Sequence, residues 1–225
     1  MRLAAPAVAG ASLETPAGLS ITGSNGTLVI TDITMIVNEL ELRRESVEDC
    51  DDRSGPGDCG SVESEFFVAD VPLGSGTVTV AADRIAKGTY TALECEVEDL
   101  EVDTDDDASD ATRIAAVLTQ LRTRFANWPA GASMRIAGTF TPTGGAPQDF
   151  VVYFDAKVEV ERLLNPPLVV DDAFTGLTVD LRPDLWFRNS DGTVRNLALS
   201  HFPTTSSLVE LEVELEGGIE IEIDD

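Results

Sequence analysis

Apolar and polar residues alternate along much of the chain, and this alternation is its strongest structural signal. Between Thr89 and Val102, apolar residues occupy every second position and glutamates stand between them: Leu93, Cys95 and Val97 against Glu94, Glu96 and Glu98. A period of two is typical of a strand with one buried face. Apolar, strand-forming stretches predict further strands at 27–44, 66–71, 77–85, 133–141, 149–164, 168–170, 176–181 and 193–200.

Turn residues separate these strands. Asn25-Gly26 predicts a two-residue hairpin turn, residues 142–147 predict the turn of a second hairpin, and Asn165-Pro166-Pro167 predicts the end of the strand before it. Within the long strand 27–44 the apolar positions change side after Asn38. We interpret that change as a bulge or as the point where the strand leaves the core.

One helix is predicted, at about 110–127, after an acidic stretch that suits the positive end of a helix dipole. Its apolar stripe follows helical spacing: Ile114, Val117, Leu118, Leu121 and Phe125. About ten short strands and a single amphipathic helix predict a mainly β protein, an antiparallel β-sandwich or Greek-key barrel. We expect one domain over 19–225, preceded by a segment, 1–18, that is an export-signal remnant or an assembly strand.

The end of the chain, 208–225, predicts a hairpin with one apolar face and one carboxylate face around Gly217-Gly218. Glutamates that face each other across strands repel, so bound cations, salt, a basic partner or burial of the apolar face must offset that repulsion. An alternative role for these charges is to keep an edge strand from aggregating.

The charge of the whole chain is −26, from 41 acids and 15 bases. Nucleic acids and anionic membranes are therefore excluded as partners, because they carry the same sign of charge. The acidic surface is explained either by adaptation to salt or by specific cation binding. The sequence has no run of apolar residues long enough to span a membrane.

Cys50 and Cys59 enclose a loop rich in Asp, Gly, Pro and Ser, which predicts a local disulfide and a location outside the cytosol. Their spacing and the lack of a nearby histidine argue against zinc. The alternation around Cys95 predicts a buried free thiol.

Two acidic stretches are candidates for a calcium site. Asp103, Asp105 and Asp107 stand at alternate positions, as at the start of an EF-hand loop, but Ala108 and Ile114 occupy positions where an EF-hand needs Gly and Glu. The second candidate is the cysteine loop, with Asp51 and Asp58. The alternatives are a solvated helix entry and an ordinary acidic loop.

No residue is assigned a catalytic or cofactor-binding role. The single histidine, His201, follows Ser200, and neighbouring residues of a strand point to opposite sides, so they form no dyad. With 41 acids, a pair suited to glycoside hydrolysis arises by chance. Phosphate-binding glycine loops are absent from the sequence.

Several short phrases carry a resemblance to known proteins: Leu28–Ile33 running into Glu39–Arg43, the Cys50/Cys59 loop, Val71-Pro-Leu73, Lys87–Tyr90, Ala137–Phe140 and Asn165–Leu168. In these the chain resembles uncharacterised bacterial secreted or lipid-anchored β-sandwich proteins. The resemblance implies a β-sandwich and export to the cell envelope or beyond, and it transfers no active-site residue.

Three functions follow as expectations. The first is a non-enzymatic extracellular or cell-envelope structural module that assembles with itself, as an oligomer or fibre, by strand addition through a segment such as 13–22. The second is a calcium-dependent binding domain for glycans or another surface ligand. The third is an enzyme of the glycoside hydrolase type.

Overall fold

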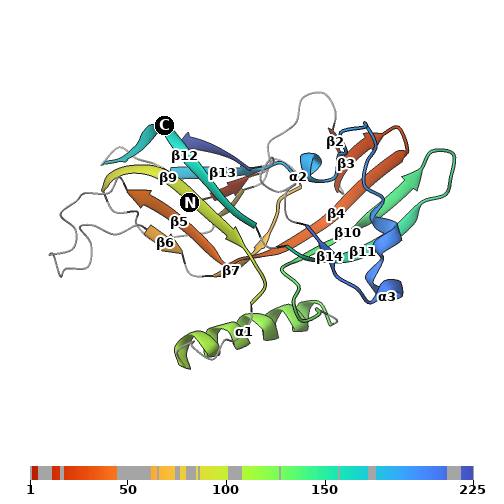
Figure 1. Ribbon diagram of the computed structural model, residues 1–225, viewed down its shortest axis with the longest axis horizontal. Coiled ribbons are helices and arrows are strands. Elements are labelled where there is room, and N and C mark those ends of the chain that lie inside the picture. Colours follow the sequence, from red (N-terminus) through yellow and green to blue (C-terminus); the bar gives the residue numbers. More distant parts are fainter. Residues whose placement is uncertain are drawn as a thin grey trace.

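The computed structural model describes residues 2–4, 12–15, 18–44, 62–64, 66–73, 77–79, 85, 87–100, 108–126, 128–156, 158–171, 176–211 and 219–224. In these residues the protein is mainly β, with three sheets and few helices (Figure 1). The predicted fold class, a β-sandwich-like protein with one amphipathic helix, is confirmed. The pairing is mostly antiparallel, but two of the strand pairs are parallel.

The largest sheet, called sheet B here, has seven strands around the long strand β4 (Gly26–Val37). On one side of β4 lie β3 (Gly18–Gly23) and β2 (Ser12–Thr15), and on the other lie β10 (Met134–Pro142), β11 (Gln148–Asp155) and β14 (Val209–Glu210). The seventh strand, β7 (Phe67–Asp70), pairs with the end of β4. The two predicted hairpins, β3–β4 and β10–β11, are confirmed.

Two four-stranded sheets complete the fold. Sheet C has the order β12 (Val158–Val170), β9 (Gly88–Val97), β5 (Glu39–Arg44) and β6 (Val62–Ser64). Sheet A has the order β15 (Ile219–Asp224), β13 (Gly176–Leu181), β1 (Arg2–Ala4) and β8 (Thr77–Thr79). The first and last described strands of the chain therefore belong to the same sheet.

The chain passes from sheet B to sheet C twice. It does so first at Asn38, between β4 and β5, which is where the apolar positions change side in the sequence. The second passage, from β11 to β12, is held by Ser133, whose hydroxyl accepts a hydrogen bond from the N–H of Ala156 at 2.7 Å. The Ser133 carbonyl also accepts from the N–H of Ile36 at 2.8 Å, so the two passages lie close together.

Sheets B and C share one hydrophobic core. Buried side chains of sheet B, such as Ile33 and Phe154, belong to the same cluster as Leu40, Cys95 and Val160 of sheet C. A second cluster lies on the other side of sheet B, where α1 (Ala108–Arg124) packs with Ile36 and Tyr153. Figure 1 shows α1 lying across the end of the molecule where β7 and β9 approach it.

The predicted stripe of the helix is the face that packs. Ile114 and Leu121 are buried, and Val117, Leu118 and Phe125 are partly buried against the same cluster. Arg124 ties the end of the helix to β7, since its guanidinium donates to Asp70 at 2.7 Å. Three short helical segments follow β13: α2 (Pro183–Trp186), η2 (Leu197–Ser200) and α3 (Phe202–Thr205).

Three local predictions are corrected by the structure. The first hairpin turns at Ser24 and Asn25, one residue earlier than predicted, since Gly26 pairs with Gly23 as part of β4. The Asn25 side-chain amide bonds both backbone groups of Val194, at 2.8 and 2.9 Å. The predicted strand at 193–200 is wrong. Val194 forms only an isolated bridge with Arg188, and the 3-10 helix η2 follows.

The third correction concerns the prolines. β12 does not end at Asn165 but runs through Pro166 and Pro167 to Val170, with a register shift against β9 between Leu163 and Leu168. Strand prolines are tolerated at a sheet edge, where no neighbour needs their N–H, and β12 is an edge strand of sheet C.

The C-terminal hairpin predicted at 208–225 is described only in part. In the described residues, β14 pairs with β11 in sheet B and β15 pairs with β13 in sheet A. The turn at Gly217-Gly218 and residues 212–216 lie outside the described residues, so the pairing of the two halves with each other stays a prediction. Leu211, which follows β14, is buried in the main core.

Candidate functional site

The face of sheet C opposite the core carries two rows of glutamates, called the glutamate face. One row runs from Glu159 of β12 to Glu96 of β9 and Glu39 of β5, and the next from Glu161 to Glu94 and Glu41. In the backbone register Glu63 of β6 extends the second row. Six glutamates of three adjacent strands thus stand directly opposite one another, an arrangement that repels unless it is compensated.

The alternation of each strand places these glutamates on one face. The intervening residues form a matching apolar row, Val160, Cys95 and Leu40, and all three are buried in the main core. Burial of this inner face fixes the register, because a slip by one residue would move the glutamates into the core. Packing on one side of the sheet therefore forces the carboxylates together on the other.

Arg43 compensates the second row. Arg43 lies two residues after Glu41 in β5, on the same face of the sheet. Its Nε donates to Glu41 at 2.9 Å, its Nη1 donates to Glu161 at 3.2 Å, and its Nη2 forms an ion pair with Glu94. One planar guanidinium thereby contacts a carboxylate on each of three adjacent strands. The hydrogen bond with Glu41, reinforced by the charges of all three glutamates, raises the pKa of Arg43.

The first row has a neutral donor instead. Asn38, at the passage between the sheets, donates from its side-chain amide to Glu96 at 3.0 Å, and its backbone N–H donates to the Glu96 carbonyl at 2.9 Å. The residue that carries the chain from one sheet to the next therefore also fixes the central glutamate of this row.

Glu94 has the most unusual environment on the face. It is only 9% exposed, because it lies between Glu41 and Glu161 and beneath Arg43. The pKa of Glu94 is raised, chiefly by burial and to a smaller extent by a hydrogen bond with Glu159. The positive charge of Arg43 lowers this pKa, but only enough to offset part of the rise. The neutral form of Glu94 is favoured because burial and the neighbouring carboxylates outweigh the one arginine beside it.

Next to the second row of glutamates, on the side of the β12 prolines, the glutamate face becomes less polar. Leu163, Ala92 and Arg43 form the next row, in which Ala92 is buried while the Leu163 side chain is 77% exposed. Val169, further along β12, is 59% exposed. The β12 edge thus combines acidic and apolar surface.

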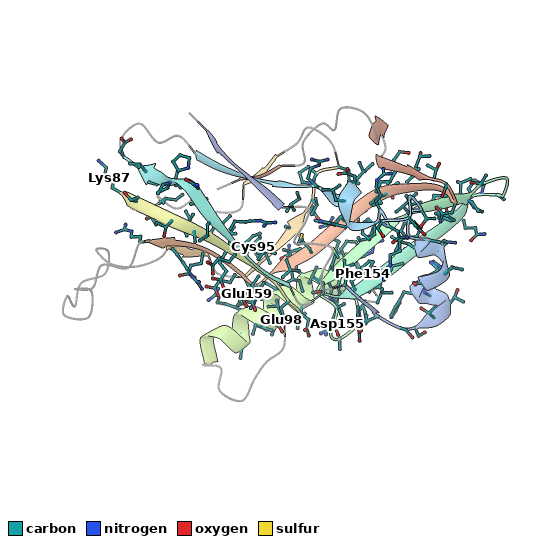
Figure 2. The ribbon with its side chains drawn as sticks, turned by 45° about the horizontal axis from the view of Figure 1, so that its top comes forward. Lys87, Cys95, Glu98, Phe154, Asp155 and Glu159 are labelled. Atoms are coloured by element: carbon teal, nitrogen blue, oxygen red, sulfur yellow. The ribbon has the colours of Figure 1, made fainter. Side chains whose placement is uncertain are left out.

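More acids lie where β9, β11 and β12 meet. Figure 2 shows Glu98, Glu159 and Asp155 in this part of the molecule, with Lys87 at the opposite end of β9. The Oδ1 atom of Asp155 is buried and accepts no hydrogen bond from the described residues. Within the described ranges, however, no three His, Cys, Asp or Glu side chains lie close enough together to hold a metal ion.

The residues that the sequence singled out as sites lie outside the described residues. This applies to the calcium candidates Asp103, Asp105, Asp107, Asp51 and Asp58, and to the cysteines of the predicted disulfide, Cys50 and Cys59. The calcium sites and the disulfide stay predictions.

Two other sequence predictions concern described residues. Cys95 is a buried free thiol, as predicted, and burial, with a smaller effect of Glu96, raises its pKa to about 12. His201 has a structural contact: its Nδ1 accepts a hydrogen bond at 3.0 Å from the N–H of Val151 in β11.

Comparisons of the chain with known protein families, curated proteins and solved structures found no match. Among the described helices, none has the length and apolar character needed to cross a lipid bilayer. The resemblance to secreted β-sandwich proteins therefore stays an expectation.

Sequence reasoning missed the glutamate face, although its strands were predicted. Glu39, Glu94 and Glu159 are far apart in the chain, and only strand order and register make them neighbours. A usable signal was present: three alternating strands each carry a Glu-x-Glu pair, at Glu39/Glu41, Glu94/Glu96 and Glu159/Glu161.

Proposed function

We propose that the protein is a non-enzymatic structural module of the extracellular space or the cell envelope, and that it assembles by strand addition. The observation that carries the proposal is the edge strand β12. It is the longest described strand, with 13 residues, and among the described strands it pairs only with β9. The backbone groups on its other edge are available to an additional strand.

The side chains support this role for β12. Soluble proteins blunt their edge strands or make them short. Here Pro166, Pro167 and the register shift blunt only the part of β12 beyond Leu163, and the earlier part, 158–163, stays in continuous register with β9 and ends in an exposed apolar side chain, Leu163. Apolar surface on an open edge favours association with another chain.

The segment first expected to add to a neighbour offers a shorter edge. Within residues 13–22, β3 lies between β2 and β4, and β2, which has four residues, stands at the edge of sheet B among the described strands. We therefore place the association surface on β12.

Sedimentation velocity of the full chain tests the assembly, over a wide range of protein and salt concentrations. Because a net charge of −26 opposes association of copies, we expect oligomers to form as added salt screens that repulsion. The variant Leu163→Lys should weaken them, whereas the control Leu199→Lys, at an exposed leucine of η2, should not. A monomer under all conditions would contradict assembly of the protein with its own copies.

A calcium-dependent binding domain for glycans or another surface ligand is the second candidate. The sequence candidates Asp103, Asp105, Asp107, Asp51 and Asp58 support it, together with a net charge of −26 that attracts cations. Titration calorimetry with calcium, with magnesium as the control, tests this function. If calcium produces no heat of binding and no shift in melting temperature, this candidate function is removed.

A further inference from the structure

We propose that the edge of β12 from Val158 to Leu164 binds an extended basic segment of another polypeptide, with Lys or Arg at alternate positions. The inference rests on the strand addition proposed above. It goes further in naming the binding stretch and the chemistry of a partner that is not a copy of this chain.

The backbone defines the length of the binding stretch. From Val158 to Leu163, β12 is in continuous antiparallel register with β9, which holds it extended, and the other edge is unoccupied by any described strand. Pro166 and Pro167 have no N–H to donate, so a ladder of hydrogen bonds to a new strand ends before them. The accepting stretch is therefore about seven residues, a usual strand length.

The side chains define what the added strand must carry. On the face opposite the core, β12 presents Glu159, Glu161 and Leu163, all exposed. On the core side it presents Val160 and Leu164, both buried, with the half-buried Arg162 between them. Residues of a new strand stand opposite these, so one of its faces needs two cationic side chains and an apolar one. Its other face needs apolar side chains opposite Val160 and Leu164 and carries no cation opposite Arg162.

The charges favour such a partner over a second copy. An antiparallel pair of β12 strands brings the Glu159 and Glu161 side chains of one copy beside those of the other, and such pairs repel. Arg43 contacts Glu161 but already shares its charge with Glu41 and Glu94. A lysine or arginine opposite Glu159 and Glu161 relieves a repulsion that exists before binding.

A fluorescent peptide in which lysine and valine alternate over about seven residues is the probe. We expect the full chain to bind it at least tenfold more tightly than a control peptide of the same composition with its lysines clustered. Binding should slow amide hydrogen exchange in residues 158–164 and leave the exchange of β10 unchanged. The double variant Glu159→Lys/Glu161→Lys should lose at least tenfold in affinity.

The matched control is Asp149→Lys/Glu210→Lys, which changes the net charge equally at exposed acids of sheet B. Equal binding of the two peptides, equal losses in the two double variants, or unchanged exchange in β12 would each overturn the proposal. Self-association without peptide binding would overturn this inference and leave the proposed assembly intact. Peptide binding by a protein that stays monomeric would support the inference and contradict assembly with copies.

Discussion

Arg43 of β5 reaches across the sheet to Glu94 of β9 and covers it, so that a glutamate with carboxylates on both sides is buried in the folded protein. The pair is the electrostatic centre of the glutamate face. Arg43 supplies the positive charge in the second row, and Glu94 is the carboxylate that this charge does not fully stabilise. Two predictions follow directly from the pair, and two others concern the core and the packing between segments.

Replacing Glu94 by Gln should stabilise the protein at neutral pH. The folded protein holds the Glu94 proton more tightly than the unfolded chain, since its pKa is raised above 4.5. Its contribution to stability is therefore full below 4.5 and is lost as the pH rises through the raised pKa. Gln imitates the protonated form, so the gain in melting temperature should be present at about pH 8 and absent at about pH 4. A destabilised Glu94→Gln protein at neutral pH would show that the ion pair with Arg43 outweighs the burial of charge.

Replacing Arg43 by Met should lower the melting temperature at neutral pH, because Glu41, Glu94 and Glu161 lose their common cation. The loss should shrink at acid pH, where the glutamates take up protons. Arg122→Met, at an exposed arginine of α1, is the control for loss of one positive charge. Equal effects of the two substitutions would show that Arg43 acts only through the net charge.

Replacing Asn25 by Ala should destabilise the protein by about 1–3 kcal/mol, because the buried Val194 loses partners for both its N–H and its carbonyl. The free energy of unfolding, measured with urea, gives the difference. Ser24→Ala changes the exposed neighbour in the same turn and should have little effect. A value near zero for Asn25→Ala would mean that water replaces the side-chain amide.

The thiol of Cys95 should be inert in the folded protein. Its pKa of about 12 leaves almost no thiolate at neutral pH, and its burial blocks access of a reagent. In the variant Cys50→Ser/Cys59→Ser it is the single cysteine, so Ellman's reagent reports on it alone. We expect reaction at least about a hundredfold slower in the native protein than in denaturant. Fast native reaction would show that sheet C opens readily.

Local patterns predicted the elements better than their partners. The stripe from Ile114 to Phe125 requires a helix with one buried face, and the alternation around Cys95 requires a strand with a buried thiol, and both are confirmed. The apolar positions change side after Asn38, and the chain does leave sheet B there. The sequence pattern alone does not distinguish a bulge from a passage between two sheets. The sequence predicts a strand at 193–200, after the turn that begins at Asn189, whereas in the structure Val194 is bound by the Asn25 side chain and a 3-10 helix follows.

The sequence by itself determined that this is an acidic, mainly β protein with one amphipathic helix, because hydrophobic periods of two and 3.6 residues are local properties of a chain. Only the tertiary structure decided where the carboxylates gather. Register brings Glu39, Glu96 and Glu159 into one row, and the order of strands leaves β12 at an edge. These relationships depend on contacts between distant segments, which the burial of shared apolar faces selects and which no local pattern specifies.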